Sequence, residues 1–402
     1  MISISIPSLS NLIPWRDRTP FTTPPMQTHE IDTAQERPAR AVKHMLKLNH
    51  ANYSLLRSDG AHRNQMPHVL GAYFLLGADA NALDRAWEAE SKALEPWVDS
   101  PAEISTYDWR DFLGKREYQR AFLDFFEDQL VVNYAYDWRK LVSDYLFTGQ
   151  EPLFKALCSG LGHTALHLST AFVLSSREVA METLALAAST MTTTANTDPP
   201  TLRHTHPQQP TYHSTSFQEI LTTAHKDKRF STATPTNDED AESILLDHYH
   251  AWTLDSQNAD AQLREALDVA ASLAASSPSP SSPDTPSILN ILVAAHAVRV
   301  LIPLIPGRFH ERLLRQWWLL TLRVYVAQGR PELLSRVSVQ EEEHDLDGRN
   351  WGWAAARCVQ GPRVDALSAQ SVLALKEAAG TWGDADGLYL RAAVRVVKGL
   401  AA

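Results

Sequence analysis

Apolar residues recur along most of the chain at spacings of three and four, the period of an amphipathic α-helix. In the segment 116–132, for example, aromatic and aliphatic residues stand at positions 118, 122, 125, 126, 130 and 131. No run of alternating Val, Ile and Thr is long enough to predict a sheet, and no repeat of about 33 to 45 residues indicates a helical solenoid. The pattern therefore predicts an all-α fold, a large multi-helix globular bundle.

The same pattern predicts where the helices lie. One helix is expected over 65–77, with Asn64 as its N-cap and Pro67 in its first turn, and another is expected to begin after Asp79. The remaining segments with helical periodicity are 35–57, 116–132, 138–147, 152–174, 243–273, 287–305, 308–327, 350–359, 366–379 and 384–402.

Changes in composition divide the chain into an arm and one domain. Residues 1–34 begin with proline-interrupted sequence that lacks a basic region and an apolar core, so they predict a flexible arm rather than a signal peptide. Residues 35–402 are expected to form a single domain. Three stretches rich in Thr, Pro or Ser, near 188–215, 230–242 and 276–286, are expected to be loop insertions in it.

The overall charge narrows the class of partner. A formal net charge of -10 and a pI near 5.9 argue against nucleic acid or an anionic membrane as the main partner, because neither would be attracted by the net field. The two cysteines do not form a disulfide framework, which favours a reducing compartment. These observations predict a soluble, cytoplasmic protein.

His163 and His167 stand four residues apart within the predicted helix 152–174. Side chains at that spacing project to the same side of a helix, an arrangement that a metal ion can bridge. The motif contains no carboxylate, so a pair of core histidines is the alternative. The adjacent Gly160-x-Gly162 lacks the third glycine and the preceding strand of a dinucleotide-binding fingerprint, so a Rossmann-type NADPH or flavin site is not indicated.

Three further histidines stand out by position. His62 and His68 flank the start of the helix 65–77, and six residues correspond to about 600° of helical rotation, so the two cannot share one helical face. They can meet one ligand only if His62 precedes the helix. His296 lies in the middle of the apolar segment 287–305, where burial favours a neutral imidazole that is hydrogen-bonded or ligated. Histidines without a chemical role are the alternative in each case.

Four segments follow one another in an order typical of one family. They are 46–53 (LKLNHANY), 60–78, which holds His62 and His68, 162–168 (GHTALHL) and 295–298 (AHAV). Together they resemble the questin oxidase-like family of fungal aromatic polyketide enzymes, to which the aflatoxin-pathway Baeyer-Villiger oxidoreductase also belongs. Asn64 stands where that family usually has the second histidine of an HNH pattern.

The resemblance implies an oxidoreductase of secondary metabolism that uses O2 to insert oxygen into, and open, the ring of an anthraquinone or xanthone-like polyketide. In this family the reaction has been described both as an NADPH-linked Baeyer-Villiger oxidation and as cleavage at a non-haem iron held by histidines and a carboxylated lysine. Histidines dispersed over several helices suit iron, because imidazole is a good ligand for it and a bundle can direct side chains from facing helices to one point.

Two versions of the site follow from this hypothesis. In the first, His62, His163, His167 and His296 hold iron around one buried pocket, and His68 orients a ligand or the substrate. In the second, no metal is used, and the same imidazoles deprotonate a phenolic substrate that then reacts directly with O2.

The chain departs from the family near its C-terminus. The family pattern there resembles D-D-x-H-x-x-K, and an ungapped placement puts Asp365, Leu367 and Gln370 at its second aspartate, its histidine and its lysine. Lys376 lies six residues farther along. The departure keeps a second function class open, that of a helical ligand-binding or scaffold protein whose catalytic site has decayed.

Overall fold

The computed structural model describes residues 19–58, 63–149, 152–191, 210–232, 238–276, 285–333, 346, 348–361 and 364–398. Within these ranges the long elements are all helices, and extended backbone pairs only in isolated bridges. The all-α prediction is confirmed. The α-helices are α1 (Arg37–Asn52), α2 (Met66–Leu75), α3 (Ala80–Glu90), α4 (Gln119–Val132), α5 (Trp138–Phe147), α6 (Ser159–Leu174), α7 (Arg177–Thr190), α8 (Phe217–Lys226), α9 (Arg229–Thr232), α10 (Asp238–Ala251), α11 (Ala259–Ser276), α12 (Thr285–Leu301), α13 (His310–Ala327), α15 (Trp351–Gln360), α16 (Ala366–Trp382) and α17 (Leu388–Lys398).

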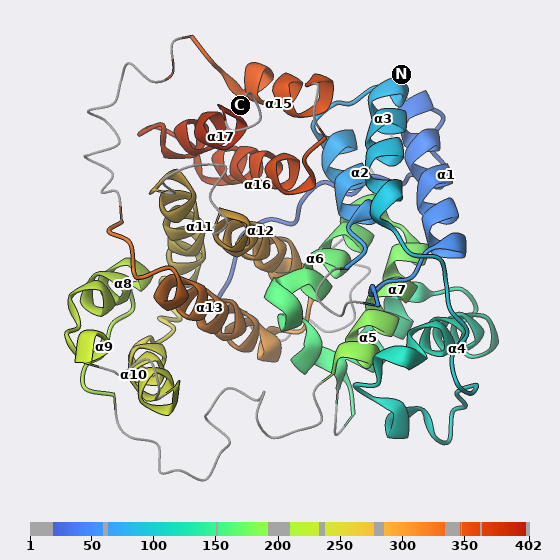
Figure 1. Cartoon of the computed structure of the whole chain (residues 1–402), viewed down its shortest axis with the longest axis horizontal. Coiled ribbons are helices and arrows are strands. Elements are labelled where there is room, and N and C mark those ends of the chain that lie inside the picture. The colour runs from blue at the N-terminus through green and yellow to red at the C-terminus, as the bar shows by residue number, and fades with distance from the viewer. Residues whose placement is uncertain are drawn as a thin grey trace.

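The centre of the bundle is α12. It packs against α6, α11, α13 and α16, and Figure 1 shows it between α11 on one side and α6 on the other. The window Ser287–Leu304 has a mean hydropathy of 1.8 and is 78% buried inside the protein. By length and composition this helix could cross a membrane, but an all-round apolar helix enclosed by other helices is also what the core of a large bundle requires.

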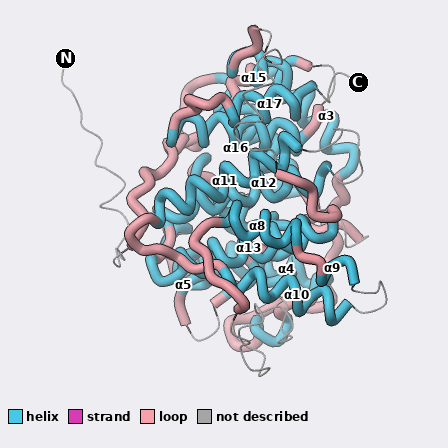
Figure 2. The backbone as a smooth tube through the Cα atoms, turned by 90° about the vertical axis from the view of Figure 1, so that its left-hand side faces the viewer, coloured by secondary structure: helices cyan, strands magenta, loops and turns pink. Residues whose placement is uncertain are grey.

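The other helices form layers around this core. Figure 2 shows α15, α16 and α17 at one end of the molecule and α5 and α10 toward the other. Near α12, the pairs α6·α7, α4·α7 and α1·α2 pack against each other, and α2 also contacts α6 and α16. As a result, α2, α6, α12 and α16 meet around one internal region, which contains the site described below.

Local sequence signals explain several helix boundaries. The Asp79 side chain accepts a hydrogen bond from the Ala82 backbone N–H at 2.8 Å, as expected of an N-cap. The predicted helix 138–147 coincides with α5. The segment 35–57 ends as a helix at Asn52, because Tyr53 is extended and pairs with Pro96.

The predicted insertions differ from the structure in part. Residues 229–232 form α9 and α10 begins at Asp238, so much of the stretch 230–242 is helical. The predicted helix 243–273 is divided between α10 and α11. Residues 188–190 continue α7. The stretches 192–209 and 277–284 lie outside the described residues.

The second half of the arm lies against the bundle. Thr22 and Thr23 donate their backbone N–H and hydroxyl groups to the Asp260 carboxylate. Farther along, the His29 N–H donates to the Val173 carbonyl at 2.7 Å. Hydrogen bonds thus hold the second half of the predicted arm at residues 22–23 and at residue 29, while residues 1–18 lie outside the described part of the chain.

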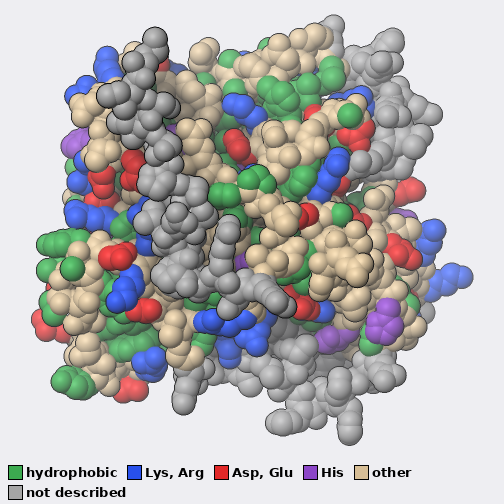
Figure 3. Space-filling model, turned by 180° about the vertical axis from the view of Figure 1, so that it is seen from behind, with side chains coloured by type: hydrophobic (Ala, Val, Ile, Leu, Met, Phe, Trp, Pro, Cys, Tyr) green, Lys and Arg blue, Asp and Glu red, His purple; other side chains and the backbone are tan. Residues whose placement is uncertain are grey.

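The surface carries charges of both signs. On the face shown in Figure 3, Lys and Arg side chains are interspersed with Asp and Glu, and neither sign forms a broad patch on the atoms coloured there. A mixed surface of this kind gives no strong local field on that face for a polyanion to follow.

Candidate metal centre

His68 enters the site from the first turn of α2. The Asn64 side chain accepts a hydrogen bond from the Met66 backbone N–H at 3.0 Å, and Pro67 occupies a position that needs no donor. The N-cap is therefore Gln65 and not the predicted Asn64, whose side chain nevertheless binds the first N–H of the helix. The side chain of His68 is 2% exposed, and its Nδ1 lies 3.3 Å from the Thr170 hydroxyl.

His163 and His167 enter from α6. The turn before them is irregular, because Leu161 and Gly162 have φ angles of 59° and 80°. A Cβ on Gly162 would lie 2.8 Å from the Cβ of Ala294, so the absence of a side chain permits the close approach of α6 to α12. After this turn the two histidines lie on one side of the helix, with ring centroids 5.5 Å apart.

The three imidazoles meet at one buried point. One nitrogen from each of His68, His163 and His167 lies within 4.8 Å of the other two, and all three residues are buried. The His68 ring stands edge-on to both partners, with centroid distances of 4.8 and 4.6 Å. The closest pair of nitrogens, His167 Nδ1 and His68 Nε2, is 3.1 Å apart.

Hydrogen bonds on the outer side of each ring indicate which nitrogens are protonated. His167 Nε2 donates to the Glu182 carboxylate at 2.9 Å. Thr170 uses its hydroxyl proton on the Leu166 carbonyl, so His68 Nδ1 is the donor to Thr170. The backbone of Asn64 bonds the His163 ring, whose Nε2 is buried without a partner. With the outer nitrogens assigned as donors, the inner nitrogen of each ring is left to share a proton or to bind a cation.

The electrostatics of the site agree with neutral rings. Burial and the neighbouring His167 and His163 hold the pKa of His68 well below its usual value. Burial, His167 and Arg63 do the same to the pKa of His163. Neutral imidazoles are the form that binds a metal ion.

A chain of hydrogen bonds extends from His167 through Glu182 to His50 and Glu127. The second oxygen of Glu182 lies 3.1 Å from His50 Nδ1, and His50 Nε2 lies 2.8 Å from Glu127. Burial lowers the pKa of His50, but hydrogen bonds to Glu127 and Glu182 outweigh it and raise that pKa to about 10. Glu182 is itself 1% exposed, and hydrogen bonds from His167 and His50 overcome the effect of burial and lower its pKa.

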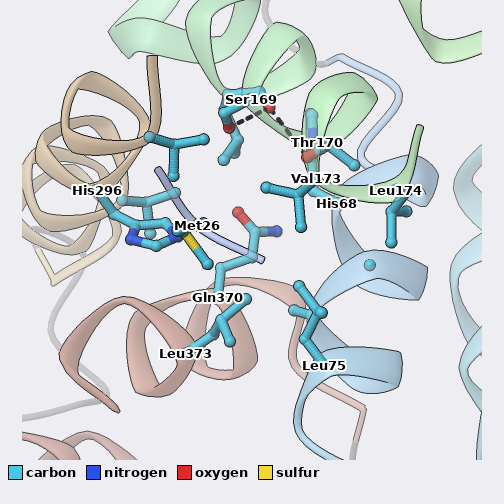
Figure 4. Close-up of a pocket in the computed structure, with 15 residues that line it drawn as sticks. Met26, His68, Leu75, Ser169, Thr170, Val173, Leu174, His296, Gln370 and Leu373 are labelled. Atoms are coloured by element: carbon cyan, nitrogen blue, oxygen red, sulfur yellow. Dashed lines mark hydrogen bonds between the residues drawn. The ribbon is translucent and has the colours of Figure 1, made fainter. Parts of the chain in front are cut away.

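His296 lies apart from the three-imidazole group, on a cavity that it shares with His68. Ala294 of α12 faces Gly162 of α6. His296 is two residues farther along α12, which corresponds to a rotation of about 200°, so its side chain points roughly opposite to that of Ala294. Figure 4 shows His296 on the α12 wall, with Gln370 of α16 and Met26 of the arm beside it. The cavity is small: the volume available to the centres of water molecules is about 30 Å³, enough for only a few of them. Burial and the neighbouring Arg299 lower the pKa of His296 to about 3.

The structure brings together His163 and His167, which were predicted as metal ligands, with His68, which was predicted to orient a ligand. His296 does not join them, and His62 lies outside the described residues.

Glu182 was not predicted from the sequence as part of the site. Its signal was a carboxylate within the otherwise apolar run of α7, the same type of signal that drew attention to His296.

Comparison with known proteins places the chain. A sequence profile described as questin oxidase-like matches residues 62–373, more than half of the chain. The chain belongs to the questin oxidase-like family. Over 158 residues it is 26% identical to a protein named Questin oxidase from Aspergillus terreus (strain NIH 2624 / FGSC A1156), a match that covers 37% of this chain and 34% of that protein.

The departure near the C-terminus has a structural counterpart. Asp365 is the N-cap of α16, where its side chain accepts from the Ser368 backbone N–H at 2.6 Å. Leu367 is half-buried and packs against the apolar core. Gln370 lies on the cavity wall with His296 and His68.

Proposed function

We propose that the protein uses O2 to insert oxygen into, and open, the ring of an aromatic polyketide, at an iron ion held by His68, His163 and His167. The single observation that carries the proposal is the convergence of three buried imidazoles, with one nitrogen of each within 4.8 Å of the other two. Lone pairs at such separations repel one another unless a proton or cation lies among them. Family membership supplies the reaction class.

The donor chemistry fits such an ion. Imidazole suits iron, zinc and copper, and ligating histidines usually donate their other N–H to a carboxylate, a carbonyl or a hydroxyl. His167 does so to Glu182 and His68 does so to Thr170. The ion would supply the redox chemistry that joins O2 to an electron-rich ring.

The remaining residues would exclude water and fix the ligands. Glu182 holds the tautomer of His167 through one oxygen and is held by His50 through the other. The cavity next to His68 is enclosed mainly by apolar side chains, including Leu166, Val173 and Leu373. Such walls favour a flat apolar ring over water.

The proposal is tested by metal binding and O2 consumption. Metal-depleted protein reconstituted with Fe²⁺ under anaerobic conditions should retain stoichiometric iron after dialysis. His163→Ala should lose it, and His44→Ala, which removes an exposed histidine on α1, should not. The loaded protein should then consume O2 when a reduced hydroxyanthraquinone is added, and the assay is run with and without NADPH.

Three outcomes distinguish an iron-dependent oxidase from a ligand-binding protein whose catalytic site has decayed. Equal iron binding by wild type and His163→Ala would show that the three imidazoles are not the iron site. No O2 consumption with any hydroxyanthraquinone or its reduced form would contradict the proposed oxidase activity. Retained binding of the aromatic compound without O2 consumption would favour the decayed ligand-binding protein.

A further inference from the structure

Gln370 is an unusual residue on the cavity wall. Its side chain is 5% exposed, and its Nε2 is buried without a hydrogen-bond partner. Figure 4 shows the amide pointing toward the middle of the cavity, between α16 and α6. Within the described part of the chain, the His296 ring across the cavity also makes no hydrogen bond.

An unpaired amide of this kind is costly. Leaving a buried donor unsatisfied destabilises the folded state, and the great majority of buried polar groups in native proteins are paired. Other polar side chains on this wall donate their hydrogen bonds to groups within the protein. Ser169 and Thr170, for instance, both donate to the Leu166 carbonyl. Gln370 and His296 therefore have N–H donors that no group on the wall uses, and these are left for a ligand.

The rest of the wall fixes the kind of ligand. Apolar side chains from four helices surround the two polar groups, and they include Leu75, Val173, Val293, Val300 and Leu373. A ligand that fits this wall is apolar over most of its surface and carries an oxygen at the position of the Gln370 amide. A quinone carbonyl or a phenolic hydroxyl on a fused aromatic ring meets both requirements.

The arm forms part of the cavity wall. Met26 lines the cavity beside His296, and the space left is too small for a fused ring system. The arm is anchored on one side by Thr22 and Thr23 on Asp260, and on the other by His29 on Val173. Between these anchors, residues 24–28 make no hydrogen bond in the described structure, and both Pro24 and Pro25 lack an N–H.

We propose that Gln370, together with His296, recognises an oxygen atom of a planar aromatic substrate, and that the Met26 segment moves aside to admit the ring. This inference rests on the proposed function for the identity of the substrate class. It makes Gln370 a specificity-determining residue, because an aromatic ring of the same size without oxygen would leave the amide unpaired.

The test compares two probes and two variants. Binding of a hydroxyanthraquinone and of anthracene is measured by quenching of tryptophan fluorescence, for wild type, Gln370→Leu and Ser169→Ala. Gln370→Leu should weaken binding of the hydroxyanthraquinone by about tenfold, the effect of one buried hydrogen bond. Its affinity for anthracene should be unchanged or higher. Ser169→Ala removes a polar group that is already paired and should change neither affinity.

Thermal unfolding of the ligand-free protein provides an independent reading. Because Gln370→Leu removes an unpaired buried amide and keeps a similar volume, its midpoint should rise above that of wild type. A residue that only supports the fold would give a lower midpoint. Met26→Ala should speed association of the hydroxyanthraquinone without changing the preference between the two probes.

The outcomes separate this inference from the proposed function. Equal changes in affinity for both probes in Gln370→Leu, or a lower midpoint with unchanged affinities, would overturn the recognition role. An unchanged association rate in Met26→Ala would overturn the role of the arm. If Gln370→Leu loses the hydroxyanthraquinone selectively while wild type consumes no O2, the recognition site stands and the oxidase fails.

Discussion

The Glu182 carboxylate lies 2.9 Å from His167 Nε2 and is almost completely buried with it. This contact keeps the proton of His167 on the outer side of the ring and leaves Nδ1 free to face His68 and His163. Glu182→Gln should therefore lower iron affinity by about 10- to 100-fold, the usual effect of losing such a partner of a ligating histidine. Competition with a chelator would measure the change.

The control for this substitution is Glu178→Gln. Glu178 lies one turn earlier on α7, is also buried, and bonds Ser176 rather than the histidines. The Glu178→Gln substitution removes the same charge from the same helix and should leave iron affinity within about twofold of wild type. Equal losses in both variants would mean that charge on α7, and not the bond to His167, sets the affinity.

The ion pair between His50 and Glu127 should make stability depend on pH. The folded-state pKa of His50, about 10, lies above the ~6.5 of an unfolded histidine. Its contribution is therefore fully present below about pH 6.5 and is lost as the pH rises toward 10. The free energy that separates wild type from Glu127→Gln in urea unfolding should be larger at pH 6 than at pH 9. Asp128→Asn, which lines the same surface hollow without bonding His50, should give no such trend.

The sequence was most informative about local structure. The apolar spacing predicted most helices because a bundle helix buries one face, and α5 and the Asp79 cap follow directly from it. The division between α10 and α11 was missed because residues 252–258 contain no glycine or proline to mark it. Here Asp255 and Asn258 form the turn through their side chains.

The site was only partly predictable for a physical reason. Spacing along one helix determines which side chains share a face, so the His163–His167 pair could be read from the sequence. Which residue from another helix joins them depends on how α2 and α6 pack. For that reason His68 and Glu182, which enter from α2 and α7, required the structure.

The hydrogen bonds from the arm to Asp260 should control the order of the arm. Replacing Asp260 with Asn leaves one acceptor oxygen for the donors of Thr22 and Thr23, so the arm should detach more often. Hydrogen–deuterium exchange of the amides at residues 19–29 should become faster, while the helical circular-dichroism signal stays the same. Asp255→Asn removes a charge near the same helix start without touching the arm and should leave this exchange unchanged. Equal exchange in both variants would contradict the anchor.

Gly162 should be intolerant of any side chain, because its φ is 80° and an added Cβ would meet Ala294 at 2.8 Å. Gly162→Ala should lower the free energy of unfolding by roughly 2 to 4 kcal/mol, since it combines a left-handed conformation with overpacking between α6 and α12. It should also weaken iron binding, because His163 is the next residue.

Gly380→Ala is the matched control: Gly380 lies in α16 with no atom within 4 Å of an added Cβ, and the change should stabilise the protein by about 0.5 to 1 kcal/mol. Urea unfolding of the two variants would measure both effects. Equal stability of Gly162→Ala and wild type would show that α6 and α12 can separate at this point without cost, and the close approach would then not be what positions His163.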